Sequence, residues 1–255
     1  MILAMNRVAE LLPHLPEMLR RDAAGEPPLF PPADPLQYAR FVIPGLPGVP
    51  WHDAAEFPWT AEFAAHHGAI RGELERFLAQ QRVTFRNYVG PILHEQADAG
   101  EWHVLYLEYR GQRWDEHCRE FPQLMTLVDQ IPRRSGTVFI SRLTPGTHIP
   151  RHCGSTNTQL TCHFGIVVPD GVELRVAREI RRQPEGRCIV FDDSFEHEVW
   201  NRSASVRYNV FMQFWHPALS AEEIAGIQTL EQLPQIQRVI EQYREGASAL
   251  ARVRN

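Results

Sequence analysis

The feature of this sequence that most restricts its fold is a series of short β-type segments between residues 137 and 217. These segments are 137–143, 159–168, 172–178, 187–191 and 205–214. Turn-forming sequences rich in proline, glycine, asparagine and serine separate them. Strands at this spacing predict an all-β sandwich or barrel rather than a parallel α/β sheet.

Helical patterns lie on both sides of this β region. Residues 60–80 and 120–131 have apolar residues at helical spacing. Ser220 and Glu223 form a capping-box pattern before another apolar stripe, which Pro234 kinks or splits. Residues 1–30 predict a short amphipathic segment that runs into a Pro-rich connector. We therefore expect a mainly β fold with flanking helices: a segment and connector at 1–43, a main domain at 44–217 with its β core at about 132–217, and C-terminal helices at 218–255.

Composition excludes several classes of function. The chain has 255 residues and no apolar run near the roughly 20 residues that a membrane span needs. A pI of 6.2 without a basic stripe argues against nucleic acid as a partner. All 26 basic residues are arginine, which excludes a lysine Schiff base or a P-loop lysine. The four cysteines form no Cys-x-x-Cys pair and no secretion signal is visible, so we expect reduced thiols and a cytoplasmic protein with no membrane partner.

Two histidines and one arginine are the candidate chemical groups. His152 and His197 each lie near the end of a predicted strand, and a double-stranded β-helix, or jelly-roll (cupin-like) barrel, would bring them together. Arg207 follows His197 by ten residues, and its planar guanidinium suits a carboxylate. Such a set is suitable for Fe(II) and a keto acid. Taken as spacing alone the pattern is weak, because a single histidine among 12 is usually structural and Arg207 could pair with a surface carboxylate.

One predicted strand has a polar face. Gln159, Thr161 and His163 alternate with apolar residues, so this face is expected to meet a ligand or solvent. Ser141 is likewise a polar residue within an apolar strand. In a barrel, these side chains could line the cavity.

Two longer segments are more specific. Residues 143–157, which read LTPGTHIPRHCGSTN, and residues 191–201, which read FDDSFEHEVWN, resemble the signature of the aspartyl/asparaginyl β-hydroxylase family. Arg207, the segment HFGIVVP at 163–169 and the WHP sequence at 215–217 also match it. With an entry segment that begins near residue 44, the resemblance spans about residues 44–217.

The resemblance implies a double-stranded β-helix core, Fe(II) and 2-oxoglutarate as cofactors, and O₂ as co-substrate. His152 and His197 match the two catalytic, iron-binding histidines of the family. Arg207 matches the arginine that binds the distal carboxylate of 2-oxoglutarate, with Ser141 beside it, and His163 matches a histidine that contacts the carboxylate nearer the iron. Gly154 stands where most such oxygenases have an acidic iron ligand, and it conforms to the family.

This sequence also departs from the family. Members that act on Asp or Asn residues have arginines on the strand before the matched histidine, where this chain has Gln159 and Thr161. We expect Thr161 to lie at the cofactor and Gln159 at the substrate, and the lost positive charge argues against an acidic anchor on the substrate. The favoured function is hydroxylation of an unactivated C–H bond in an amino acid, a peptide or a carrier-bound substrate, with conversion of 2-oxoglutarate to succinate.

Three other functions are consistent with the sequence. Gly154 leaves a ligand position that halide occupies in some related halogenases, so halogenation or desaturation at the same site is one alternative. A catalytically inactive binding module is another, and a cupin-type zinc hydrolase that uses Glu196 or Glu198 is a third. Asp192 or Asp193 is a candidate for orienting His197, and the C-terminal helices are candidates for a homodimer contact.

Overall fold

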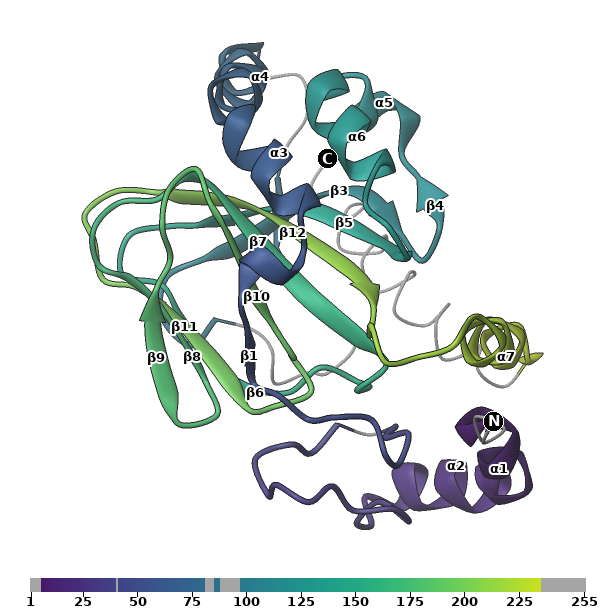
Figure 1. Cartoon of the computed structure of the whole chain (residues 1–255). Helices are drawn as coiled ribbons and strands as arrows, with labels where there is room; N and C mark the ends of the chain where they lie inside the picture. Colours follow the sequence, from purple (N-terminus) through teal and green to yellow (C-terminus); the bar gives the residue numbers. More distant parts are fainter. Residues whose placement is uncertain (1–5, 40, 81–84, 88–96, 235–255) are drawn as a thin grey trace.

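Two antiparallel sheets form the centre of the molecule (Figure 1). This computed structural model describes residues 6–39, 41–80, 85–87 and 97–234. The larger sheet has the strand order β1-β10-β7-β12-β5-β3-β2, with β4 paired to β3, and the smaller sheet has the order β6-β11-β8-β9. The strands are β1 (Trp51–His52), β2 (Arg86–Asn87), β3 (Trp102–Tyr109), β4 (Gln112–Arg113), β5 (Arg134–Leu143), β6 (His148–His152), β7 (Gln159–Val167), β8 (Val172–Val176), β9 (Glu179–Arg182), β10 (Cys188–Phe191), β11 (His197–Asn201) and β12 (Arg207–Trp215).

The path of the chain between the sheets defines the topology. From β5 onward it passes to the smaller sheet at β6, returns at β7, enters the smaller sheet again at β8 and β9, and then alternates through β10, β11 and β12. This winding is that of a double-stranded β-helix, which is the predicted fold class. It makes β6 and β11 neighbours, although they are far apart in sequence.

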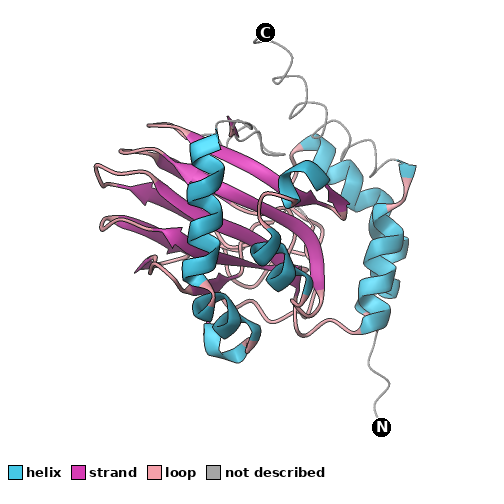
Figure 2. Ribbon diagram, turned by 90° about the horizontal axis from the view of Figure 1, so that it is seen from above, coloured by secondary structure: helices cyan, strands magenta, loops and turns pink. Residues whose placement is uncertain are grey.

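Helices cover the outer face of the larger sheet, as Figure 2 shows from above. They are α3 (Trp59–Ala65), α4 (His67–Gln80), α5 (Asp115–Cys118) and α6 (Pro122–Asp129), with the short 3-10 helix η2 (Ala54–Glu56) before them. A second group lies to one side and contains α1 (Arg7–Leu11), η1 (Leu12–His14), α2 (Leu15–Ala24) and α7 (Ala221–Glu231). Among the described residues, no helix is both long and apolar enough to cross a membrane.

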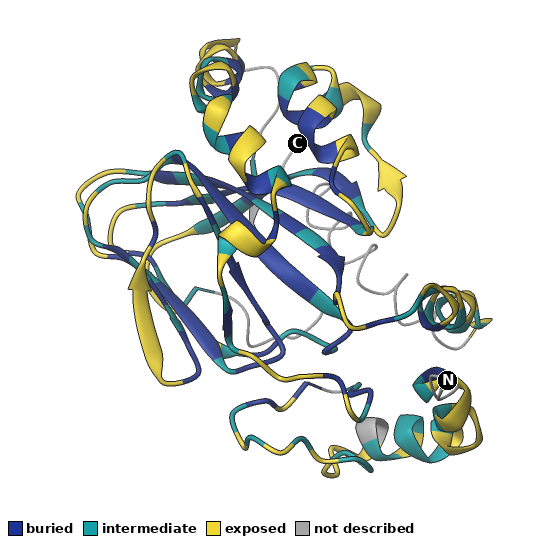
Figure 3. Ribbon diagram, viewed as in Figure 1, coloured by how far each residue is buried: buried dark blue, intermediate teal, exposed yellow. Residues whose placement is uncertain are grey.

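Strand alternation separates the main core from the interior of the barrel. On β7, Leu160, Cys162 and Phe164 are fully buried against the covering helices, whereas Gln159 and His163 line the cavity between the sheets. Figure 3 shows that strands of the larger sheet are mostly buried, whereas β9, an edge strand of the smaller sheet, is exposed. The hydrophobic core therefore lies mainly outside the barrel, which leaves the interior available for polar groups.

The five predicted β segments are all strands, with ends that differ by up to three residues. The predicted helix at 60–80 is two helices that meet at His66, the predicted helix at 120–131 is α6, and the Ser220–Glu223 capping box is present. Sequence periodicity did not identify the other seven described strands, β1, β2, β3, β4, β6, β9 and β11. Those in the smaller sheet lack a continuous apolar run, and β3 and β1 extend the larger sheet N-terminal of residue 132. The helices expected beyond Pro234 lie outside the described residues.

Glu223 joins α7 to α1, and its removal is expected to destabilise the protein. Its carboxylate accepts hydrogen bonds from the Arg7 guanidinium at 2.7 and 2.8 Å and from the Ser220 backbone at 2.8 Å. The Arg7 hydrogen bonds lower the pKa of Glu223 to about 2. Glu223→Gln should cost about 1.5–3 kcal/mol in urea unfolding at pH 7.

The pH dependence of that difference tests its cause. Because the folded-state pKa is lowered, the stabilisation is fully present above the ordinary carboxyl pKa of 4.5 and is lost as pH falls toward 2. Glu222→Gln, at the exposed neighbour on the same turn, should change stability by only about 0.5 kcal/mol. Equal losses in the two variants, or a loss independent of pH, would contradict the assigned role of the Arg7 pair.

Candidate active site

His152 and His197 face each other inside the barrel. They end β6 and begin β11, and the two residues are direct cross-strand partners. Their ring centroids lie 4.0 Å apart, and both rings line the cavity between the sheets. The double-stranded β-helix thus brings the two predicted histidines together.

The hydrogen bonds of the two rings define their tautomers. Nδ1 of His152 lies 2.7 Å from the Pro150 carbonyl oxygen, and Nδ1 of His197 lies 2.9 Å from that of Phe195. Because a carbonyl oxygen only accepts, each Nδ1 carries the proton and each Nε2 keeps its lone pair. Within the described part of the chain neither Nε2 has a hydrogen-bond partner. Both Nε2 atoms therefore remain available as metal ligands.

Burial keeps both rings neutral. It lowers the pKa of His152 to about 4, and it lowers the pKa of His197 well below its usual value, with the neighbouring His152 adding to the shift. Neutral imidazole is the form that binds a transition metal. Among the described residues, no three His, Cys, Asp or Glu side chains form a metal-binding group. The residues present fit a metal ion with two protein ligands and several open positions, a donor set suitable for Fe(II).

Arg207 is a buried cation that lines the cavity. Only 2% of the residue is exposed, and the described residues provide no carboxylate partner for it. Its Nη1 donates to Ser141 Oγ at 3.2 Å and to Asn209 Oδ1 at 2.5 Å, whereas its Nε has no partner among these residues. Burial lowers its pKa to about 9. A buried guanidinium of this kind is strongly stabilised by an anion that enters the cavity.

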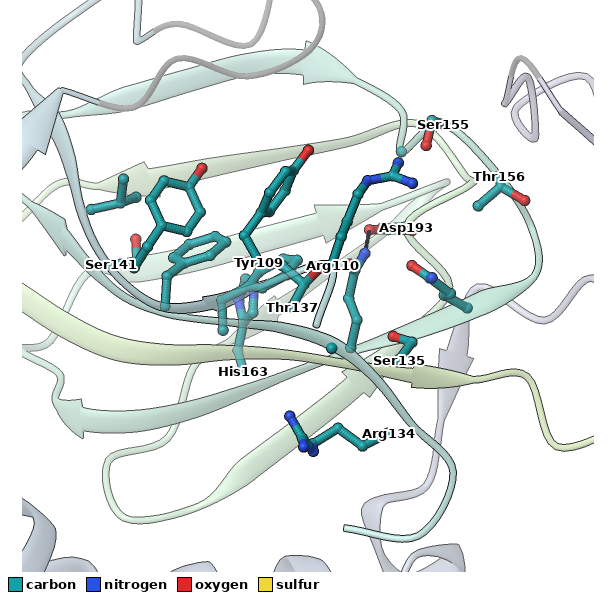
Figure 4. A pocket seen from close by; sticks show the side chains of 18 of the residues that line it. Tyr109, Arg110, Arg134, Ser135, Thr137, Ser141, Ser155, Thr156, His163 and Asp193 are labelled. Carbon is teal, nitrogen blue, oxygen red and sulfur yellow. Dashed lines mark hydrogen bonds between the residues drawn. The ribbon is translucent and has the colours of Figure 1, made fainter. Parts of the chain in front are cut away.

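Two other predicted residues lie close to Arg207. Ser141 Oγ also accepts a hydrogen bond from Trp102 Nε1 at 3.0 Å, which holds the hydroxyl in place. His163 lines the cavity with its Nδ1 unpartnered among the described residues, and burial, with Arg207 adding, lowers its pKa well below the usual value. Figure 4 shows Ser141, His163 and Asp193 around the same cavity. Its volume of about 650 Å³ is larger than 2-oxoglutarate alone requires.

Thr161 lies behind the cavity wall instead of on it. It is fully buried, and its hydroxyl donates to Asp193 Oδ2 at 2.8 Å; Gln213 Nε2 donates to the same oxygen at 3.2 Å. Its predicted contact with the cofactor remains a prediction, and the contact that the structure describes is with Asp193. Gln159, the predicted substrate residue, lines the cavity.

Asp193 occupies the space next to Gly154. A Cβ added at Gly154 would lie 2.6 Å from Asp193 Oδ1 and 2.7 Å from its Cγ, closer than atoms can approach. The Gly154 N–H also donates to the Asp193 carbonyl oxygen at 2.7 Å. Glycine at this position is therefore required by packing against a carboxylate that Thr161 and Gln213 anchor.

Gly154→Ala is expected to destabilise the protein by about 1–3 kcal/mol, since the new methyl group must displace this anchored carboxylate. Urea unfolding of the metal-free protein measures the effect. The double variant Gly154→Ala/Asp193→Ala should lose less stability than the sum of the losses measured for the two single variants. Gly146→Ala has no atom within 4 Å of its added Cβ but needs a positive φ, so it controls for backbone strain alone. Additivity in the double variant would contradict the steric explanation.

Glu196 and Glu198, the candidates for a zinc hydrolase, do not line the cavity. Arg175 binds both carboxylates, Glu196 at 2.7 Å and Glu198 at 2.5 Å, and His148 also contacts Glu198. Asn209, Trp102 and Gln213 are site residues that sequence reasoning missed. Asn209 has a usable signal, because it lies two residues after Arg207 on the same strand face, whereas Trp102 and Gln213 have none.

The fold and the cavity define a jelly-roll protein with a pair of facing histidines in its interior. The family model described as aspartyl/asparaginyl β-hydroxylase matches residues 64–217. The chain therefore belongs to the aspartyl/asparaginyl β-hydroxylase family, a family of hydroxylating enzymes, and the resemblance seen in its sequence is confirmed.

Relatives within this family differ in what their names describe. The chain is 33% identical over 190 residues to an ornithine lipid ester-linked acyl 2-hydroxylase of Rhizobium tropici. The aligned region covers 72% of this chain and 65% of that protein. It is 37% identical over 195 residues to the aspartyl/asparaginyl β-hydroxylase of Homo sapiens, and that aligned region covers 73% of this chain and 25% of the human protein. A 2OG-Fe(II) oxygenase family oxidoreductase from Burkholderia pseudomallei matches with a TM-score of 0.43 and 17% identity, over 61% of this chain and 90% of that one. A likeness at that level supports no conclusion by itself.

Proposed function

We propose that this protein is an Fe(II)- and 2-oxoglutarate-dependent dioxygenase that hydroxylates an unactivated C–H bond. The observation that supports this best is a single cavity with two neutral, metal-competent histidines and a buried arginine that lacks a carboxylate partner among the described residues. One half of this arrangement suits a metal ion and the other half suits a dianionic keto acid.

Each residue has a role that follows from its contacts. His152 and His197 hold the iron through Nε2, while their Nδ1–H groups donate to backbone carbonyls that orient the rings. Arg207 and Ser141 would bind the distal carboxylate of 2-oxoglutarate and His163 would contact its other carboxylate, while Asn209 orients the guanidinium. When bound, iron and 2-oxoglutarate supply, with O₂, the oxidation of the C–H bond, and 2-oxoglutarate becomes succinate and CO₂.

Asp193 favours hydroxylation over halogenation. The space beside Gly154, where a halide would replace an acidic ligand, adjoins the carboxylate of Asp193. A negative charge at this place repels a halide ion. The intact histidine pair and Arg207 likewise argue against an inactive binding module. Mass analysis of the product separates hydroxylation, which adds one oxygen atom, from desaturation, which removes two hydrogen atoms.

The cavity favours a substrate that is uncharged at the reacting carbon. Gln159 lines the cavity and Thr161 lies behind it, where family members that act on acidic residues have arginines, and Thr161 instead anchors the carboxylate of Asp193. Arg110 and Arg134 also line the cavity, but each is paired with a glutamate, Glu231 and Glu108 respectively. The rings of Phe139 and Phe211 stack on the cavity wall with their centroids 4.3 Å apart. The centroid of the Tyr106 ring, which also lines the cavity, lies 5.4 Å from that of Phe139. An acyl chain or an uncharged residue of a peptide fits these walls, and the name of the Rhizobium relative describes hydroxylation of an acyl group.

An anaerobic titration with Fe(II) and 2-oxoglutarate tests the cofactor proposal through the visible absorption band of the chelate. A saturable band supports it, and the absence of a band with both ligands in excess overturns it. Succinate formation with N-acyl amides, uncharged peptides and acidic peptides then tests the substrate class. Preference for the acidic peptides would overturn the assignment of an uncharged substrate.

A further inference from the structure

We propose that Gln37 is a positioning residue of the metal site, although it lies in the N-terminal segment, outside the part of the chain that the family model matches. This inference rests on the proposed function, because it concerns how the metal-binding histidines are held. It assigns a role to residues 34–39 and 41–43, which pack against the two loops that flank His152 and His197.

Gln37 contacts the turn that precedes His197. Its side chain is buried, with 6% of the residue exposed. Its Nε2 donates to Ser194 Oγ at 2.9 Å and approaches Asp192 Oδ2 at 3.4 Å. Asp192 Oδ1 in turn accepts from the Ser194 backbone N–H at 3.0 Å and from its hydroxyl at 2.5 Å. Asp192 and Ser194 are both fully buried, so the loss of the Gln37 amide would leave polar groups unsatisfied.

The backbone of the same segment reaches the residue that orients the His197 ring. Gln37 forms an antiparallel bridge with Phe195, and the Glu196 N–H donates to the Leu36 carbonyl oxygen at 2.6 Å. The Phe195 carbonyl oxygen is the acceptor for Nδ1–H of His197. The side chain and the backbone of Gln37 therefore both contact the turn that contains Phe195, whose carbonyl oxygen orients the His197 ring.

The segment also holds the loop that follows His152. The Phe41 N–H donates to the Ser155 carbonyl oxygen at 2.9 Å. The Asn157 side chain exchanges two hydrogen bonds with the Ile43 backbone, at 2.9 and 3.0 Å. One stretch of chain thus joins the loops of both histidines, which come from different strands of the smaller sheet. Partners that orient metal-binding histidines affect metal affinity even when they never touch the metal.

The test measures Co(II) binding to the full-length protein, since Co(II) has a visible spectrum that reports the geometry of its site. Gln37→Met keeps the length of the side chain and removes the amide. We expect about tenfold weaker Co(II) binding and an altered absorption band. At saturating Fe(II), kcat should change less than the concentration of Fe(II) required for half-maximal activity. Ser194→Ala, which removes the acceptor of the Gln37 amide, should shift Co(II) affinity in the same direction and serves if Gln37→Met does not fold.

Gln130→Met is the matched control. It is the same substitution at an exposed glutamine that caps the C-terminus of α6 and does not line the cavity. Its Co(II) affinity and band should remain those of the wild type. The proposal is overturned if Gln37→Met and Ser194→Ala bind Co(II) as the wild type does, or if Gln130→Met weakens binding equally. A wild-type protein without saturable Co(II) binding would instead overturn the metal site itself.

Discussion

Replacement of His152 or His197 by alanine is expected to abolish the Fe(II)·2-oxoglutarate absorption band and all succinate formation. The described residues contain no third metal-binding side chain near this pair, so each variant leaves one protein ligand. A lost ligand that costs about 4 kcal/mol of metal affinity corresponds to a roughly 1,000-fold weaker Kd. Both variants should fall below the detection limit of an assay at micromolar iron.

His148→Ala is the control for this prediction. His148 belongs to the same strand as His152, but its ring stacks on Trp200 at 5.4 Å and contacts Asp98 and Glu198 instead of lining the cavity. Its loss should leave the chelate band and turnover close to wild type. Retained turnover in His152→Ala or His197→Ala would show that the metal is held elsewhere.

Arg207→Met is expected to weaken 2-oxoglutarate binding by about 100-fold or more. Removal of one partner of a buried charge pair costs about 2–5 kcal/mol, and the larger part of this range exceeds 100-fold. The apparent KM for 2-oxoglutarate should therefore rise much more than kcat falls. Arg142→Ala provides the control, because Arg142 contacts His103 and does not line the cavity.

The stability of the same variant provides an independent readout. In the ligand-free protein, Arg207 is a desolvated cation whose pKa is lowered by burial, so its charged form opposes folding. Arg207→Met should therefore unfold at the same temperature as the wild type or at a higher one. Added 2-oxoglutarate should raise the Tm of the wild type alone. A large loss of stability in the ligand-free variant, with an unchanged KM, would assign Arg207 to the fold and not to the ligand.

Local patterns in the sequence predicted much of this protein. Apolar alternation predicted the strands that pack under the helices, because burial of one strand face produces a period of two residues. The capping box before α7 needs only residues within one turn of helix, so it too was readable from the chain. The motifs around His152 and His197 pointed to the family, and the fold then placed the two rings 4.0 Å apart.

Other features depended on contacts between residues distant in sequence. Thr161 could be assigned to a polar strand face from alternation, but only the register between β7 and β10 and the turn that follows β10 bring its hydroxyl to Asp193. Neighbouring strands β3 and β5 likewise bring Trp102 to Ser141, and nothing in the sequence near either residue indicates that pairing.

The sequence by itself determined the positions of five of the strands, the capping box of α7 and the identity of the candidate histidines and arginine, because short-range periodicity and motif identity encode them. Only the tertiary structure decided that Asp193 fills the space beside Gly154, that Arg207 is buried without a carboxylate partner among the described residues, and that Gln37 supports the turn before His197. These features arise where the chain crosses between two sheets. Hydrogen-bond partners and desolvation there are set by which strands become neighbours, a property that no local stretch of sequence contains.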